Sequence, residues 1–428
     1  MSIHELSRRE FIKLAGAGAA LSTLSGCMTT PEIRKPIGQV VIVGGGWGGA
    51  TAAKYIRMWS GGTVQVFMIE RNSEFVSCPL SNLVLGGSRK IEDLTLPYAG
   101  LREYGVQVIR DEVKAINIEK KRVVLTRFED FPYDKLIVAP GVDFMYDQVA
   151  GLNADAQKVI LHAWKAGPET VALRKQLESM PDGGVFLLSI PRAPYRCPPG
   201  PYERACQVAL YLKNSKPKSK LIVLDANENI VSKPGLFSAA WKDLYAGIID
   251  YRPNNEVKEV DYKGMSVKTD FDTIKANVIN VLPPMRAGEI ARTTGLINAN
   301  NRWCGVDWVT MESTAQKNIH VLGDATLAAA LMPKSGHMAN SHAKIAAAAI
   351  VAMLSGRDVN PAPVIANTCY SFMSDQLAAH VSSVHRYDIA KKELLTVPGS
   401  GGISAQNNAL EHQYAQAWAR NIWADMLM

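Results

Sequence analysis

Short apolar runs that alternate with glycine turns and helical segments recur along the chain. The β-branched run QVVIV begins at Gln39 and leads into a glycine cluster, after which ATAAKYI has the spacing of a helix. Further apolar runs follow as VQVFMIE from Val64, YDKLIVAPG from Tyr133, GGVFLLS from Gly183, KLIVLD from Lys220 and IHVLGDA from Ile319. This alternation predicts an α/β fold built on parallel sheets.

The glycine cluster has the spacing of a dinucleotide-binding turn. Gly44, Gly46 and Gly49 match the pattern GxGxxG, and Glu70 ends the next predicted strand twenty-one residues beyond Gly49. The first glycine permits a tight turn, the second lets the backbone approach a pyrophosphate, and the third allows close packing of helix on strand. A glycine turn that serves packing alone is the alternative. A glutamate at this position favours FAD or NAD over NADP.

Composition and charge are those of a packed globular protein. The 428 residues suffice for two or three domains, and 47% of them are hydrophobic and 20% charged. The 47 basic and 40 acidic residues leave a formal net charge of +7, spread along the chain without the long basic run typical of nucleic-acid binding. We therefore predict no nucleic-acid partner.

The chain has six cysteines and eight histidines, and their spacing limits the metal sites that it could form. The chain lacks CxxCH and paired CxxC motifs, so we expect no attached haem, zinc or iron–sulfur cluster. The histidines show no metal-ligand spacing, and we expect His162, His320, His337 and His342 to be structural. Setting Cys27 aside leaves an odd number of cysteines, so in an oxidising compartment one thiol stays free, modified or bonded to another group.

The N-terminus carries an export pattern, which we assign to residues 1–30. SRREFIK precedes a weakly apolar stretch of small residues, and together they predict a twin-arginine signal and a periplasmic destination. A chance Arg-Arg pair in an amphipathic helix is the alternative. The sequence Leu-Ser-Gly-Cys27 also resembles a lipobox, in which an acylated Cys27 would tether the protein to a membrane, while cleavage at a small-residue site would release it. No later apolar run has transmembrane length.

Three further segments are similar to those of one known family. FVSCPLSNLVLGG from Phe75, APYRCPPGPYERA from Ala193 and GDATLAAALMPKSGHMANSHAK from Gly323 resemble the flavin (FAD) subunit of flavocytochrome c sulfide dehydrogenases, a branch of the disulfide-reductase-type flavoproteins. The resemblance covers almost the whole chain after the signal. It implies two Rossmann-like, glutathione-reductase-like folds: a split FAD domain at 36–150 and 271–357, an inserted degenerate NAD-like domain at 151–270, and a small C-terminal α+β domain at 358–428.

The resemblance also implies roles for single residues. Cys78 matches the cysteine that is joined covalently to FAD, with a buried, inert cysteine as the alternative. Cys197 matches the redox-active cysteine and stands near Arg196 and Arg204 in the sequence, which predicts a lowered thiol pKa and a nucleophile or sulfur acceptor. A cysteine held by prolines for structural reasons is the alternative. Asp324 matches the residue that binds the ribityl chain. The other residues assigned to the cofactor are Val113, Ala139, Gly141, Gly323, Lys334 and Ser335, and Lys334 is the candidate counter-charge to the flavin.

One position departs from the family. The family has a second redox cysteine directly after Gly-Asp-Ala, where this chain has Thr326. Hydrosulfide would then attack the flavin directly while Cys197 holds the sulfur, another cysteine such as Cys206 would substitute, or the substrate would differ. Cys304 and Cys369 also match family positions, and they would be buried or paired with each other.

Two further features are a proline-rich turn in the inserted unit and a pair of tryptophans in the tail. Four prolines between Pro194 and Pro201 stand where a nicotinamide-binding unit would have its glycine turn, and prolines lack the amide donors that a pyrophosphate needs. An NAD(P)H-dependent reductase is therefore disfavoured. In the tail, Trp418 and Trp423 have helical spacing, and we expect them to pack in a core rather than to face a partner.

These observations predict an FAD-dependent oxidoreductase that oxidises sulfide or a related reduced sulfur species in the periplasm. The resemblance implies a separate c-type cytochrome as the electron acceptor. Because the second redox cysteine is absent, an accessory electron-transfer flavoprotein that docks a cytochrome or a sulfur carrier is the alternative.

Overall fold

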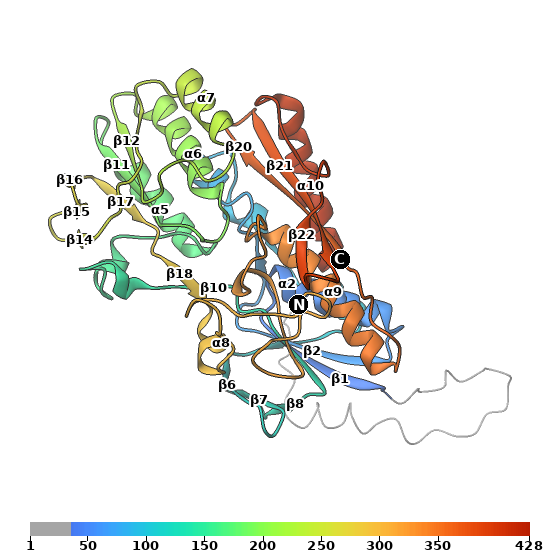
Figure 1. Cartoon of the computed structure of the whole chain (residues 1–428). Helices are drawn as coiled ribbons and strands as arrows, with labels where there is room; N and C mark the ends of the chain where they lie inside the picture. Colours follow the sequence, from blue (N-terminus) through green and yellow to red (C-terminus); the bar gives the residue numbers. More distant parts are fainter. Residues whose placement is uncertain (1–35) are drawn as a thin grey trace, which may run out of the picture. The chain divides into compact units, whose positions relative to one another are not determined.

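A five-stranded parallel sheet carries the glycine turn (Figure 1). Its strands run in the order β19 (Ile319–Val321), β9 (Lys135–Val138), β1 (Gly38–Val43), β2 (Val64–Glu70) and β5 (Gln107–Arg110). The first strands of the chain thus share a sheet with a strand from beyond residue 300, which is the split arrangement that the sequence predicts. The computed structural model describes residues 36–428, and the export pattern and Cys27 lie outside them.

Helices pack on this sheet, which explains the composition of its strands. β9 and most of β1 are buried and read as continuous apolar runs, as is typical of parallel strands covered on their faces. α2 (Trp47–Trp59) follows the glycine turn, and α9 (Gly336–Leu354) packs along it. Buried alanines such as Ala53 and Ala346 let these two helices approach closely.

A second parallel sheet forms the inserted unit. Its order is β13 (Ile249–Arg252), β12 (Lys220–Asp225), β11 (Val185–Ile190) and β17 (Val278–Val281), and its helices are α5 (Pro168–Ser179), α6 (Gly200–Ser215) and α7 (Pro234–Leu244). β17 pairs with β11, so this sheet extends past residue 270, where the sequence placed the end of the insertion. The boundary lies later because β17 follows a small antiparallel sheet of β14 (Glu259–Asp261), β15 (Ser266–Lys268) and β16 (Thr273–Lys275).

Two short strands mark where the chain leaves the first sheet and returns to it. β10 (Val142–Phe144) pairs antiparallel with β18 (Met285–Ala287). One of the smaller elements, η3 (Ala156–Lys158), packs against the second sheet, since Ala156 shares a core cluster with Leu187 and Ile279. The others are β3 (Phe75–Val76) with β4 (Thr95–Leu96), the meander β6 (Val113–Asn117), β7 (Arg122–Leu125) and β8 (Phe131–Pro132), the helices α3 (Asn82–Gly86), α4 (Ala99–Glu103) and α8 (Glu289–Thr293), and the 3-10 turns η1 (Ile91–Leu94), η2 (Tyr146–Gln148) and η4 (Gly323–Ala325).

The C-terminal part is an antiparallel sheet with one long helix. β20 (Val364–Phe372) pairs with β21 (Ala378–Asp388), which also pairs with β22 (Glu393–Thr396) and β23 (Gly402–Ile403). α10 (Ala409–Leu427) packs on β20, β21 and α2 (Figure 1). The C-terminal part therefore packs against α2, the helix that follows the glycine turn.

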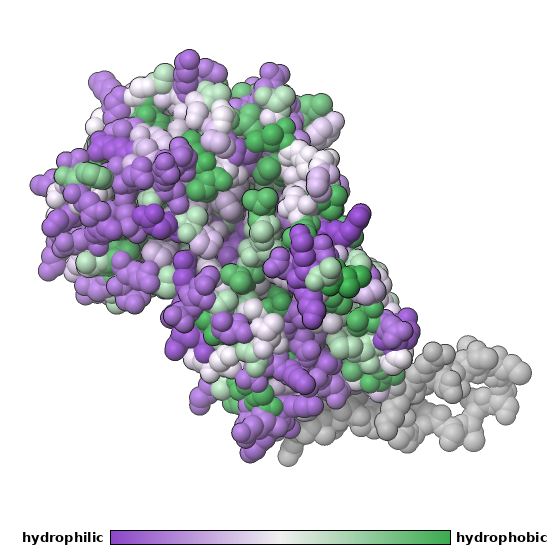
Figure 2. All heavy atoms as spheres, viewed as in Figure 1, coloured by the Kyte–Doolittle hydropathy of each residue, from purple (hydrophilic) through white to green (hydrophobic). Residues whose placement is uncertain are grey.

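One hydrophobic core cluster includes buried residues of both parallel sheets and of the C-terminal part. Hydrophilic residues cover most of the visible surface around β14, β15 and β16 (Figure 2). No helix within residues 36–428 has the length and hydrophobicity needed to cross a bilayer.

Candidate functional site

A cavity of about 780 Å³ opens at the carboxyl ends of the strands of the first sheet. Its wall is drawn from the glycine turn, the segment after β3, the loop before α6, the start of α9, and β20 and α10. Of the residues predicted for the cofactor, it includes Gly44, Gly46, Glu70, Cys78, Val113, Ala139, Gly141, Gly323, Asp324 and Ser335, and it also includes Cys197. Ligands of parallel sheets bind at this edge.

The three glycines of the turn meet different surroundings. Gly44 has a φ of +97°, and a Cβ there would lie 2.6 Å from the carbonyl oxygen of Ala139. A Cβ on Gly49 would lie 1.8 Å from the carbonyl oxygen of Gly44, so Gly49 is required for packing and does not line the cavity. A Cβ on Gly46 would meet no atom within 4 Å. The open space at Gly46 fits the close backbone approach of a pyrophosphate at the start of α2.

Glu70 is held in place at the end of β2. Its Oε2 accepts a hydrogen bond from the amide of Gly45 at 2.7 Å, and its Oε1 accepts from Asn72 Nδ2 at 2.8 Å. The Tyr98 hydroxyl donates to the carbonyl of Gly45 at 3.0 Å. These bonds fix the carboxylate beside the turn, and Glu70 lines the cavity with oxygens of the kind that accept from ribose hydroxyls.

Asp324 is a buried acid with an unmet hydrogen-bonding need. It follows Gly323 in η4, lines the cavity, and its Oδ1 has no hydrogen-bond partner within the described residues. Burial raises the pKa of its carboxyl. A buried polar atom without a partner is costly, and a hydroxyl-bearing ligand in the cavity would satisfy it. This fits the ribityl chain of FAD that the sequence assigns to Asp324.

Lys334 differs from the prediction, because its side chain does not line the cavity. Its Nζ donates to the carbonyl oxygens of Asp324, at 3.1 Å, and of Thr326, and it lies 3.7 Å from the centre of the Trp303 ring. Burial lowers the pKa of its ammonium to about 7. The structure therefore gives Lys334 the role of holding the η4 turn, and the predicted counter-charge to the flavin is not in the cavity wall.

The first turn of α9 lines the cavity, and so does Ser335, one of the residues predicted for the cofactor. Ser335 caps the helix, since its Oγ accepts from the amide of Met338 at 3.0 Å. The same Oγ donates to Asn367 Oδ1 on β20 at 2.6 Å. The wall here consists of Ser335, Gly336 and His337, and it presents the positive end of the helix dipole to the cavity.

Cys78 lies just after β3 as a half-buried free thiol in the cavity wall. Its carbonyl oxygen accepts from the amide of Ser81 at 3.0 Å, which holds the turn that leads into α3. This position fits a thiol that faces a ligand better than it fits the alternative of a buried, inert cysteine.

Cys197 is held in an uncommon backbone conformation in the loop before α6. Its φ is +60°, its amide donates to the carbonyl of Lys334 at 2.8 Å, and its own carbonyl accepts from the amide of Gly200 at 2.9 Å. A Cβ on Gly200 would lie 2.9 Å from the Cys197 sulfur, so a glycine is needed there. Non-glycine residues with positive φ cluster at functional sites.

The lowered thiol pKa predicted for Cys197 is wrong. Burial raises the pKa, and the charges of Cys369 and Glu203 raise it further, while Arg196 lowers it only in part. Arg204 points elsewhere, with its guanidinium donating to Asn82 Oδ1 at 3.0 Å and to the carbonyl of Ala163 at 2.6 Å. Desolvation thus outweighs the neighbouring guanidinium group.

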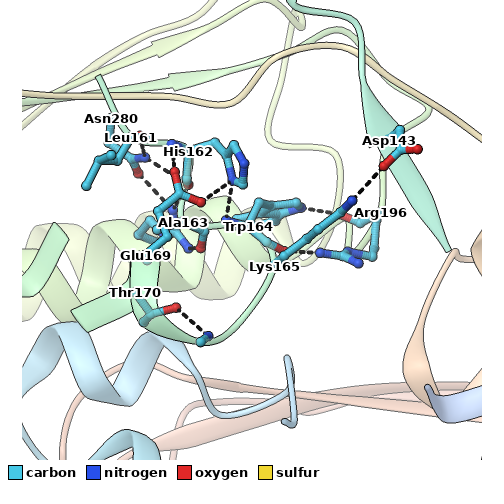
Figure 3. Close-up of polar contacts among 12 residues, drawn as sticks. Asp143, Leu161, His162, Ala163, Trp164, Lys165, Glu169, Thr170, Arg196 and Asn280 are labelled. Atoms are coloured by element: carbon cyan, nitrogen blue, oxygen red, sulfur yellow. Dashed lines mark hydrogen bonds and ion pairs between the residues drawn. The ribbon is translucent and has the colours of Figure 1, made fainter. Parts of the chain in front are cut away.

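The segment from Leu161 to Thr170 forms hydrogen bonds with the loop that carries Cys197 (Figure 3). Trp164 Nε1 donates to the carbonyl of Arg196 at 3.2 Å, and the Arg196 guanidinium donates to the carbonyl of Trp164. Lys165 Nζ pairs with Asp143 Oδ1 at 2.6 Å, which ties the segment to β10. The segment also contacts α6, because Arg204 donates to the carbonyl oxygens of His162 and Ala163.

A neutral histidine supports this segment. The Trp164 amide donates to His162 Nδ1 at 2.9 Å, and Glu169 Oε1 accepts from the His162 amide at 3.0 Å (Figure 3). Burial, followed by the charge of Arg204, lowers the pKa of His162 to about 3. No group of three or more metal-ligating side chains occurs within residues 36–428.

The other described cysteines separate into one in the wall and two outside it. Cys369 on β20 lines the cavity, which the sequence reasoning missed. Cys206 is buried in α6, where its sulfur accepts from Trp241 Nε1 at 3.3 Å, and Cys304 is buried beside the backbone of Thr326. All five cysteines from Cys78 onward are free thiols, so of the two alternatives for Cys304 the structure shows the buried role and not the pairing with Cys369.

Thr326 lies outside the cavity wall, and the two tryptophans of α10 have different surroundings. Thr326 is buried, and its hydroxyl donates to the carbonyl of Gly323 at 2.8 Å, so it closes the η4 turn without lining the cavity. Trp423 packs in the core, and its Nε1 donates to Ser77 Oγ at 3.2 Å. Trp418 instead lines the cavity and stacks on Trp47 with ring centres 6.2 Å apart. Helical spacing alone could not distinguish these two roles.

The split parallel sheet, the glycine turn and the cavity define a flavoprotein of the two-dinucleotide-fold, disulfide-reductase type. Residues 170–283 match the family model described as the central part of the sulfide dehydrogenase [flavocytochrome c] flavoprotein chain. Residues 361–427 match the flavin-binding model of flavocytochrome c sulphide dehydrogenase, and residues 38–167 match the pyridine nucleotide-disulphide oxidoreductase model. The chain is thus similar to flavocytochrome c sulfide dehydrogenase flavoprotein chains in its central and C-terminal parts, and to pyridine nucleotide-disulphide oxidoreductases in its first part.

Individual relatives agree with this assignment. The chain is 48% identical over 46 residues to the sulfide dehydrogenase [flavocytochrome c] flavoprotein chain of Chlorobaculum thiosulfatiphilum, a match that covers 11% of this chain and 94% of that sequence. It is 23% identical over 299 residues to the mitochondrial sulfide:quinone oxidoreductase of Dictyostelium discoideum, covering 68% of this chain and 66% of the relative's length. The solved sulfide:quinone oxidoreductase of Aquifex aeolicus has the same fold, with a TM-score of 0.73, 19% identity and 91% of each chain covered.

Proposed function

We propose that the chain is a periplasmic sulfide dehydrogenase subunit that holds FAD covalently through Cys78 and passes electrons to a c-type cytochrome. The observation that carries the proposal is that two free thiols, Cys78 and Cys197, reach one dinucleotide-sized cavity from different elements of the fold. Export through the twin-arginine route and a lipid anchor at Cys27 remain proposals from the sequence.

The residues present fit the cofactor at each end of the cavity. Gly46 and the start of α2 would face the pyrophosphate, Glu70 the ribose, and Asp324 the ribityl chain. When bound, FAD supplies an acceptor for two electrons. A thioether at Cys78 would prevent loss of the cofactor.

Cys197 provides the site at which sulfur is held. Hydrosulfide and the Cys197 thiol form one S–S bond, which gives a persulfide on Cys197 and releases one proton and two electrons. Because the loop is braced by Trp164 and by the carbonyl of Lys334, the sulfur is kept in one position while the bond forms.

The covalent tether gives the first prediction. Acid precipitation of the holoenzyme should leave the yellow colour with the protein, because a thioether survives denaturation. Cys78→Ser should release the flavin into the supernatant, measured by absorbance. Colour that leaves the unmodified protein on denaturation would contradict the tether.

The sulfur-holding role gives the second prediction. Cys197→Ser should abolish sulfide-dependent reduction of cytochrome c while the flavin content stays unchanged. Cys206→Ser is the matched control, since Cys206 lies outside the cavity and serine still accepts from Trp241. Full turnover in the Cys197 variant would remove Cys197 from the chemistry.

The electron acceptor needs its own assay, because relatives of this chain include sulfide:quinone oxidoreductases. We expect steady-state turnover with sulfide and a soluble c-type cytochrome, and little with a short-chain quinone. Turnover with the quinone alone would replace the cytochrome in the proposal, and the absence of turnover with either would favour an accessory electron-transfer flavoprotein.

A further inference from the structure

A guanidinium group without a carboxylate partner lies in the cavity wall beside Cys197. Arg196 directly precedes Cys197, is half-buried and lines the cavity. Its guanidinium donates to the carbonyl of Trp164, and the ion pairs formed within residues 36–428 do not include it. Because a guanidinium group carries several N–H donors, Arg196 keeps donors and a full positive charge for a ligand in the cavity.

The other cations at this end of the cavity wall already have partners. Lys165 Nζ pairs with Asp143 Oδ1 at 2.6 Å (Figure 3). Arg204 is buried, and its guanidinium donates to oxygens of the protein, among them the carbonyl of Ala163 at 2.6 Å. Among the described residues near Cys197, Arg196 is therefore the cation whose charge can act on a ligand.

Two buried acids in the same part of the wall make this charge necessary for an anion. Glu203 and Asp324 both line the cavity. Burial raises the pKa of both carboxyls, and the charge of Arg196 opposes this shift at Asp324. Either acid in its ionised form repels an anion that approaches Cys197, and Arg196 offsets that repulsion.

The backbone holds the cation and the thiol in a fixed relation. Trp164 Nε1 donates to the carbonyl of Arg196 at 3.2 Å, and the Cys197 amide donates to the carbonyl of Lys334 at 2.8 Å. These two bonds fix consecutive residues of one loop to two different segments of the chain. The charge of Arg196 is therefore placed beside the sulfur before a ligand enters.

We propose that Arg196 attracts anionic substrate to Cys197, so that the site selects hydrosulfide and similar small sulfur anions over neutral sulfur compounds. This inference rests on the proposed function and assigns the charge of its substrate. A charged group in a cavity raises the association rate of an oppositely charged ligand by about 10- to 1,000-fold, and added salt weakens the effect.

Two alkylating reagents that differ in charge test the attraction without sulfide. Iodoacetate is an anion and iodoacetamide is neutral, and both react with the same thiolate. In the reduced holoenzyme, the ratio of their rates at the Cys197 peptide, measured by mass spectrometry, is therefore independent of the thiol pKa. We expect Arg196→Gln to lower the ratio of iodoacetate to iodoacetamide by about tenfold, and Arg196→Lys to keep most of it. Glutamine still has an N–H donor for the carbonyl of Trp164.

Arg192→Gln is the matched control, because it makes the same substitution in the same loop. The Arg192 side chain is 69% exposed, pairs with Glu256 at 3.8 Å and lies outside the cavity wall. The ratio should be unchanged in this variant, and rising ionic strength should lower it there and in the unmodified protein but hardly in Arg196→Gln. Equal ratios in Arg196→Gln and the unmodified protein would overturn the proposal.

Reduction of the flavin by sulfide, followed by anaerobic stopped-flow absorbance, separates this inference from the proposed function. Arg196→Gln should lower the second-order rate constant by about tenfold and weaken its dependence on salt. A rate constant and salt dependence equal to those of Arg192→Gln would disprove the role of Arg196 and leave the proposed function intact. A flavin that sulfide does not reduce, in an unmodified protein that prefers iodoacetate, would disprove the proposed function and leave the anion site intact.

Discussion

Gly46 and Gly49 belong to one turn, but the space around them differs. We therefore expect substitutions at the two positions to have different effects. We expect Gly46→Ala to fold normally, since its Cβ meets no atom within 4 Å, and to lose flavin, since the methyl group enters the space of the pyrophosphate. Flavin content per protein and the thermal unfolding temperature measure the two effects. Normal flavin content in Gly46→Ala would mean that the cofactor does not approach this turn.

Gly49→Ala should instead destabilise the fold. Its Cβ would lie 1.8 Å from a backbone carbonyl oxygen, which cannot move without displacing β1 from α2. We expect the free energy of unfolding to fall by about 3 kcal/mol, as for other severe steric conflicts in a core. An unfolding midpoint equal to that of Gly46→Ala would contradict this distinction.

At this scale the sequence predicts what depends on neighbouring residues and misses what depends on tertiary contacts. The glycine turn follows from local backbone requirements, and the structure has it. The side-chain direction of Lys334 depends on Trp303, and the raised pKa of Cys197 depends on burial, and neither is visible in the sequence. Cys369 matches a family position, but nothing near it in the sequence shows that it lines the cavity.

Among the helices, α9 and α10 begin with side-chain caps of the same kind but with different neighbours. Ser335 Oγ accepts from Met338 at 3.0 Å, and Asn408 Oδ1 accepts from Glu411 at 2.9 Å. We expect Ser335→Ala and Asn408→Ala each to lower the free energy of unfolding by about 1 kcal/mol. Chemical denaturation of the two variants measures this.

The two caps should differ in their effect on the flavin. Ser335 lines the cavity and also bonds to Asn367, so Ser335→Ala should shift the visible absorption spectrum of the holoenzyme, whereas Asn408→Ala should not. Identical spectra for both variants would show that the start of α9 does not contact the ring.

The elements themselves were largely predictable, because the strands of both parallel sheets are apolar runs bounded by turns. The end of the inserted unit was not, since β17 has no local feature that assigns it to the second sheet rather than the first, and its partner β11 lies far back in the chain. The different roles of Trp418 and Trp423 within α10 were not predictable for the same reason, because they depend on contacts with distant parts of the chain.

For the molecule as a whole, buried neutral histidines make stability depend on pH. Burial, followed by the charge of Lys334, lowers the pKa of His342 to about 3, and its Nδ1 accepts from the amide of Gly323 at 3.3 Å. Below about pH 6.5 the unfolded chain takes up a proton that the folded chain does not. The free energy of unfolding should therefore fall as the pH decreases from about 6.5 toward 3, by up to about 1.4 kcal/mol per pH unit for this residue.

His342→Gln isolates this contribution, since glutamine keeps an acceptor but does not titrate. Denaturation from pH 4 to 7 should give a shallower dependence on pH in the variant, by about one proton. Glu203 and Asp324, whose pKa values are raised by burial, act in the opposite direction in both proteins and cancel in the comparison. Parallel curves would show that His342 is protonated in the folded chain.

The route of the chain through the first sheet has a consequence for how the protein is made. β9 and β19 are adjacent strands, yet the entire second sheet lies between them in the sequence, and α9, which covers α2, comes later still. The strands of this sheet that come early in the chain lack the neighbouring strand β19 and the helix α9 until the later segments are present. All four strands of the second sheet, in contrast, lie within residues 185–281. Joining such distant segments costs loop entropy and slows folding. We infer that the nucleotide pocket matures last, and that early fragments of the chain would be the species most exposed to aggregation.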